Sequence, residues 1–141
     1  MDSTQRSIIE WQCQQLLNRA TNLLDKGEWD ALVALYTENA ELFRPSDPHN
    51  SIQGRAAILE SFRARPPKTT CHVLANTEFN VINADQVVAF SRVWLASGPA
   101  GQGVVPTEGP IAIGSFSDTL VREADHWRIA SRRGSMELKY S

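Results

Sequence analysis

The sequence predicts an α+β domain, with helices packed against one face of a sheet. Two observations lead to this class. Apolar residues recur every three or four positions through residues 1–65, and every second position through most of the remaining chain. Helices that precede a run of strands are typical of folds in which the helices gather on one face of an antiparallel sheet. The 141 residues are enough for one core of ordinary size, so we expect a single domain over residues 1–141.

Three helices are expected before the main run of strands. The first has Ser3 or Thr4 as its cap, and Gly27 is placed to end it. A short second helix is expected in GEWDALVALYTENA. The third is IQGRAAILESFRAR, and the proline pair that follows ends it.

The strands are marked by alternating polarity and by turn residues. A first strand is expected in AELFRP and a turn-rich loop in RPSDPHNS. Four antiparallel strands then follow at residues 69–82, 86–97, 111–123 and 126–138. The strand at 86–97 is apolar on both faces, which indicates that sheet curvature or another subunit covers its second face. We expect a homodimer.

The composition excludes several classes of function. The chain is 42% hydrophobic and 21% charged, with a net charge of −2, so nucleic acid and anionic membranes are not expected partners. No apolar run is long enough to span a bilayer. The N-terminal MDSTQRSIIEWQCQQ lacks the apolar segment of a secretory signal, and we expect a cytoplasmic protein. Cys13 and Cys71 fit no metal spacing and are expected to be buried thiols.

Four stretches resemble the nuclear transport factor 2-like superfamily, in particular its SnoaL-like branch. They are LLDKGEWDALVALYTENAEL, GRAAIL, TTCHVLANTEF and IGSFSDTLVREADHWRIASR, and the likeness extends over nearly the whole chain. It implies a cone-shaped, strongly curved, mostly antiparallel sheet wrapped around about three N-terminal helices. It also implies an enclosed apolar pocket for a small hydrophobic molecule. The superfamily contains enzymes and non-catalytic proteins, so the fold alone does not determine the chemistry.

The resemblance also implies a pair of site residues. Scytalone dehydratases and hexachlorocyclohexane dehydrochlorinases pair an Asp at the end of the first helix with a His on the strand after the third. Those positions are Asp25 and His72 here. The likeness to the dehydrochlorinases continues through Thr70 and Asn76 in T-x-H-x-x-x-N, and one form of them has an active-site Arg at the position of Arg132.

The chain departs from both enzyme families around this pair. The dehydrochlorinases have a lysine where this chain has Ala20, and the dehydratases have a tyrosine where it has Leu24. The second histidine of the dehydratases is missing from IAIGSFSDTL. The substrate is therefore expected to differ from theirs.

An Asp–His pair suits the removal of a proton from carbon. A histidine can take up a proton near neutral pH, and a carboxylate on its other nitrogen fixes the tautomer and stabilises the imidazolium. With His72 as the base, Asp25 as its orienter and Arg132 as an anion stabiliser, the chain would be a cofactor-independent lyase or isomerase, with no metal. Tyr36, Phe62, Phe90 and Asn76 are expected to contact the substrate.

Other interpretations of the same residues stay open. On the strand at 69–82 the odd-numbered positions are the more apolar set, so His72 falls on the wetter face, as it would if it lined a cavity or merely met solvent. A structural or surface role for His72 therefore stays open. Arg132 could instead pair with Asp118 across the last hairpin. The alternative function is a non-catalytic small-molecule-binding protein, or an accessory subunit of the dioxygenase β-subunit type.

Overall fold

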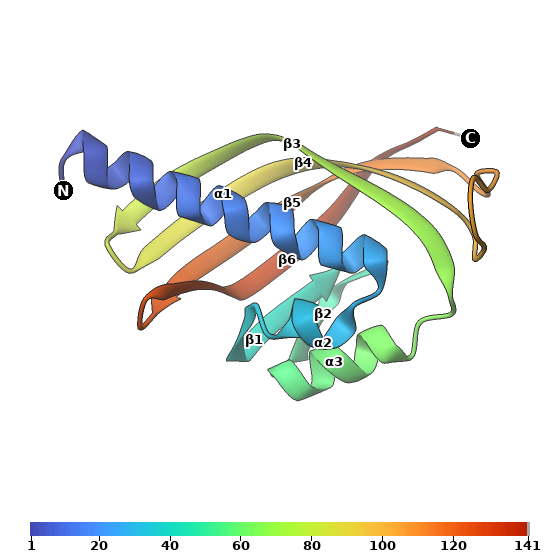
Figure 1. Ribbon diagram of the computed structural model, residues 1–141, viewed down its shortest axis with the longest axis horizontal. Helices are drawn as coiled ribbons and strands as arrows, with labels where there is room; N and C mark the ends of the chain where they lie inside the picture. Colours follow the sequence, from blue (N-terminus) through green and yellow to red (C-terminus); the bar gives the residue numbers. More distant parts are fainter. Residues whose placement is uncertain (141) are drawn as a thin grey trace.

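The computed structural model describes residues 1–140 and shows helices lying on one face of a curved sheet (Figure 1). The elements in chain order are α1 (Ser3–Lys26), α2 (Trp29–Val33), β1 (Tyr36–Arg44), β2 (Asp47–Gln53), α3 (Arg55–Arg63), β3 (Lys68–Asn83), β4 (Gln86–Pro99), β5 (Ile111–Glu123) and β6 (His126–Tyr140). The six strands form one unclosed sheet in the order β2-β1-β6-β5-β4-β3. All neighbours are antiparallel except β1 and β6, which are parallel. The predicted α+β class with a curved, mostly antiparallel sheet is confirmed.

Helix α1 crosses the inner face of the sheet (Figure 1). Its cap is Asp2, one residue before Ser3 and two before Thr4, the expected caps. The Asp2 carboxylate accepts from the Gln5 N–H at 2.8 Å, and the Gln5 side chain accepts from the Asp2 N–H at 3.0 Å, so both N-terminal donors are satisfied. Gly27 ends the helix in the left-handed conformation, as predicted, with φ +67°. Because α1 ends there, Asp25 lies in its last turn.

The region between α1 and α3 differs from the sequence-based expectation. The second helix stops at Val33, and Tyr36 already begins β1, where it pairs with Ile129 of β6. The loop expected in RPSDPHNS contains β2, which pairs with β1 at the edge of the sheet. An edge strand tolerates Pro48 because the outer edge needs no hydrogen bonds from the chain. This strand was not predicted from the sequence because its apolar residues hardly alternate.

A β-bulge in β3 reverses which side chains face inward. The pairing with β4 shifts between Ala75 and Glu78, and Asn76 between them has φ +54°. An extra residue moves every later side chain to the opposite face. Even-numbered positions therefore face inward before the bulge and odd-numbered ones after it. The assumption of one uniform alternation was wrong: His72 points inward, whereas Cys71 lies exposed on the outer face and is not the buried thiol we expected.

The core lies between the helices and the inner face of the sheet. Its largest fully buried members are Leu17, Tyr36, Ile58, Leu120 and Ile129, and Cys13 is buried among them. Within residues 1–140, no helix combines the length and apolarity that a membrane crossing needs. The end of the core near α2 and α3 is incompletely filled, and this is where the candidate site lies.

Candidate functional site

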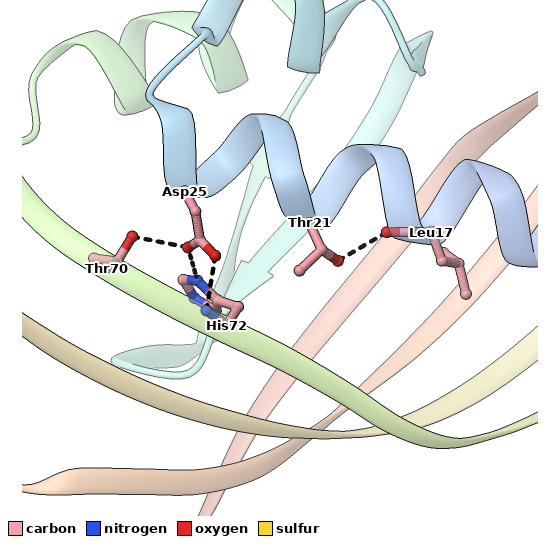
Figure 2. A network of polar contacts seen from close by, with 5 residues as sticks. All are labelled: Leu17, Thr21, Asp25, Thr70 and His72. Atoms are coloured by element: carbon pink, nitrogen blue, oxygen red, sulfur yellow. Dashed lines mark hydrogen bonds and ion pairs between the residues drawn. The ribbon is translucent and has the colours of Figure 1, made fainter.

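Asp25 points from the last turn of α1 toward β3, where three donors meet its carboxylate (Figure 2). Thr70 Oγ1 donates to Oδ1 at 2.9 Å, and the backbone N–H of His72 donates to Oδ2 at 2.8 Å. The ring Nδ1 of His72 lies 2.6 Å from Oδ1. The negative end of the helix dipole disfavours a carboxylate at this position. The β3 donors explain why an acidic residue is nevertheless held there.

The environment keeps Asp25 ionised and thereby fixes the tautomer of His72. Burial alone would raise the pKa of Asp25, but the hydrogen bonds from the His72 ring, the His72 backbone and Thr70 outweigh it and lower the pKa below 3.8. An ionised carboxylate only accepts, so Nδ1 carries a proton, and in the neutral form of the ring the lone pair is on Nε2. The His72 side chain is 11% exposed and lines a cavity. The structure therefore brings Asp25 and His72 together, with a basic nitrogen left for a ligand.

Two adjoining cavities meet at His72. The inner one has a volume of about 240 Å³ and reaches toward the buried face of the sheet. The outer one has about 740 Å³ and includes Asp25, and both are lined by His72, Arg65 and Leu95. The inner volume lies below the roughly 300–1,000 Å³ usual for drug-sized ligands. The site accordingly suits a small molecule.

Two of the expected contact residues lie at the wall of the inner cavity. Tyr36 is 2% exposed, and burial raises the pKa of its phenol, which therefore stays protonated and can donate. Phe62 is buried and stacks on Trp29, with ring centroids 5.3 Å apart. The two side chains give the cavity one polar donor and one flat apolar surface.

Arg132 is paired with Asp118, its neighbour across the last hairpin. Nε donates to Oδ1 at 2.7 Å and Nη2 to Oδ2 at 3.1 Å, with side chains 4% and 0% exposed. Burial alone would lower the pKa of Arg132, and the Asp118 carboxylate more than offsets this. The guanidinium also lies 4.2 Å from the centre of the Phe116 ring and borders the inner cavity. Pairing with Asp118 and a place at the pocket were alternatives for Arg132, and the structure combines them. The pairing neutralises the charge of Arg132.

Two expected contact residues lie elsewhere. Asn76 sits exposed at the bulge of β3, and Phe90 is 37% exposed on the outer face of β4 beneath Arg92. Neither lines either of the two cavities at His72. Their expected place in the pocket was wrong. The bulge in β3 turns Asn76 away from the cavities, and the alternation of side chains along β4 places Phe90 on the outer face.

The sequence-based analysis missed two cavity residues with charged side chains. Arg44 at the end of β1 and Arg65 just after α3 both line the inner cavity. Each directly precedes a proline, Pro45 and Pro66, so both stand where an element is forced to end. That shared position is the only sequence signal they carry. Within the described 140 residues, no three His, Cys, Asp or Glu side chains come together as metal ligands.

A model of the SnoaL-like domain matches residues 5–133. The chain belongs to the SnoaL-like domain family. The resemblance inferred from the sequence is thereby confirmed. No curated protein is significantly similar to this SnoaL-like chain in sequence.

Solved structures share its fold at low sequence identity. A scytalone dehydratase-like protein from Novosphingobium aromaticivorans is 17% identical, with a TM-score of 0.82 over 98% of this chain and 90% of that one. A type 2 hexachlorocyclohexane dehydrochlorinase is 16% identical, with a TM-score of 0.82 over 98% and 91%. A Catenulispora acidiphila protein in complex with S-DNPA is 20% identical, with a TM-score of 0.74 over 92% and 94%. At these identities the likeness concerns the fold.

Proposed function

We propose that this SnoaL-like protein is a cofactor-independent lyase or isomerase that removes a proton from carbon in a small hydrophobic molecule. The observation that carries the proposal is the 2.6 Å contact between Asp25 Oδ1 and His72 Nδ1 at the wall of a cavity. A general base must be within hydrogen-bond reach of its substrate and of the group that orients it. The cavity gives a substrate access to His72, and Asp25 is the group that orients the ring.

In the proposed reaction, Nε2 of His72 takes a proton from a carbon of the substrate. The C–H electron pair becomes a C=C bond, and a leaving group on the next carbon departs with its own bonding pair. If that group is hydroxide, the imidazolium returns the proton and water is formed; a halide leaves as the ion. In an isomerisation, the imidazolium instead returns the proton to another carbon. Asp25 stabilises the imidazolium throughout.

Two other residues take proposed supporting roles. The protonated phenol of Tyr36 can donate a hydrogen bond to an oxygen on which negative charge develops. Arg132 is proposed as part of the cavity wall rather than as the main anion stabiliser, because Asp118 already takes two of its donors. The neutralised arginine holds its position beside Phe116.

A direct test follows the exchange of the C2 protons of 1-tetralone for deuterium in D₂O by NMR. The wild type should accelerate exchange over buffer, and His72→Gln and Asp25→Asn should each lose about 10²-fold or more of that acceleration. His126→Gln is the matched control, because His126 is exposed at the start of β6 and lines neither cavity. Exchange that is equal in the wild type and in His72→Gln would contradict the proposal and favour a non-catalytic binding protein.

A homodimer is proposed from the outer face of the sheet. Val73, Trp94, Ile113 and Leu138 are aligned partners across β3, β4, β5 and β6, and three of them are 38–64% exposed. Such a continuous apolar row is typical of an interface between subunits. Sedimentation of the wild type and of Trp94→Glu would test this, with a dimer expected only for the first. A cytoplasmic location stays a prediction.

A further inference from the structure

Among residues 1–140, the inner cavity has three arginines and no carboxylate in its largely apolar wall. Arg44, Arg65 and Arg132 all border its apolar wall. The outer cavity continues this pattern, because Lys26 and Lys68 line it and Asp25 is the only acidic residue in its wall within the described part of the chain. The chain as a whole carries a net charge of −2. Positive charge is therefore concentrated at this opening, where it attracts anions.

Two of the cavity arginines have no counter-charge. Arg132 is neutralised by Asp118. Among residues 1–140, neither Arg44 nor Arg65 has a carboxylate within 4.0 Å. Cations beside an apolar cavity are normally paired, because burial without a partner is costly.

Arg44 is held in place with donors to spare. Its Nη2 donates to the carbonyl of Ser61 at 2.8 Å, which fixes the guanidinium. Its Nε is buried and has no hydrogen-bond partner in the described chain. A buried donor without an acceptor is uncommon and costly, because the hydration that it loses on folding is not replaced.

Arg65 approaches the same cavity from the end of α3. Its guanidinium lies 4.6 Å from the centre of the Phe62 ring, although the residue as a whole remains exposed at the opening. Burial of the head, together with repulsion from Arg44, lowers the pKa of Arg65 to about 10. Arg44 and Arg65 line the same cavity, and an anion bound there would offset their mutual repulsion.

We propose that Arg44 and Arg65 bind the carboxylate of the ligand, which is a small apolar acid. A planar carboxylate matches the forked donors of guanidinium groups, and the flat Phe62 and Phe116 side chains would hold the hydrocarbon body. This inference rests on the proposed function for its orientation: an acid held by the arginines presents its carbon chain to His72, which lines the same cavity. The substrate class would then be aryl or alkyl carboxylic acids.

The test compares cinnamate with the neutral, nearly isosteric cinnamamide by calorimetric titration at pH 7. The wild type should bind cinnamate at least about tenfold more tightly, as expected for charge-assisted hydrogen bonds. Arg44→Gln and Arg65→Gln should each reduce this preference, and the double variant should abolish it. Arg6→Gln removes the same charge from an exposed site on α1 outside both cavities and should keep the preference.

Equal affinity of the wild type for acid and amide would overturn the inference, as would an acid preference that survives in Arg65→Gln and in the double variant. Absence of binding to both probes at millimolar concentration would also count against it. Circular dichroism shows whether each variant is folded. If Arg44→Gln is destabilised, Arg65→Gln still tests the inference, because Arg65 is exposed at the opening of the cavity. Because binding is measured without turnover, the absence of an acid preference in the wild type rejects the carboxylate subsite alone, whereas the absence of tetralone exchange by the wild type rejects His72 as the base.

Discussion

The buried Arg132–Asp118 pair allows a prediction whose size follows from its burial. Asp118→Val removes the carboxylate and leaves the Arg132 guanidinium, 4% exposed, without its counter-charge. Breaking such a buried pair from one side typically costs about 3–5 kcal/mol. For a chain of 141 residues, each kcal/mol lowers Tm by roughly 3–4 °C, so a fall of about 10–20 °C is expected.

Replacing both partners should cost much less than replacing one. In Asp118→Val with Arg132→Met, no charge stays buried, and the two apolar side chains remain neighbours across β5 and β6. Urea unfolding of the wild type, both single variants and the double variant, followed by tryptophan fluorescence, gives the coupling energy. A loss below about 1 kcal/mol in Asp118→Val, as for exposed ion pairs, would refute the reasoning. So would a double variant that loses as much as the sum of the single ones.

Three further predictions concern single side chains. The pKa of Asp25 is lower in the folded protein than its ordinary 3.8, so between the folded and the unfolded pKa the folded state binds fewer protons than the unfolded state. The stability advantage of the wild type over Asp25→Asn should therefore be full above the unfolded pKa and vanish as the pH falls through the folded pKa. Urea unfolding at a series of acid pH values measures this advantage, and an advantage that does not change with pH would contradict the prediction. Leu95→Trp, in the wall of both cavities, should abolish cinnamate binding while the circular dichroism stays native, and retained binding would place the ligand elsewhere. Burial raises the pKa of the Cys13 thiol to about 12, whereas Cys71 is exposed. A thiol reagent at pH 8 should therefore label only Cys71 until the protein unfolds, and peptide mass mapping would show which cysteine is labelled.

The sequence predicted those parts of the fold that depend on local patterns. The end of α1 at Gly27 and the turns before Gln86 and His126 were correctly placed, because glycine and short turn residues act locally. Strand β2 was not predicted, since its seven residues carry almost no apolar alternation and only pairing with β1 makes them a strand. The change of inward face along β3 was not predicted either, because the bulge at Asn76 is a property of the pairing with β4.

Some residues of the candidate site could likewise be predicted from the sequence, and others could not. Asp25 and His72 could be named from the sequence because their neighbours in the chain resemble those of known enzymes. Arg44 and Arg65 could not, because they reach the same cavity only after β1 and α3 have folded against each other. Their surroundings contain no local pattern beyond a following proline. Proximity of residues that are distant in the sequence depends on tertiary packing, which periodicity does not encode.

The central claim is that Asp25 holds His72 with its Nδ1 protonated and its Nε2 free toward the cavity. The most direct measurement is the tautomer of His72 by ¹⁵N NMR, at a pH where the ring is neutral, in the wild type and in Asp25→Ala. The account predicts that the wild type carries the proton on Nδ1, given the 2.6 Å contact with an ionised carboxylate, and that Asp25→Ala loses this preference. A proton on Nε2 in the wild type, or a tautomer that does not respond to Asp25→Ala, would contradict it.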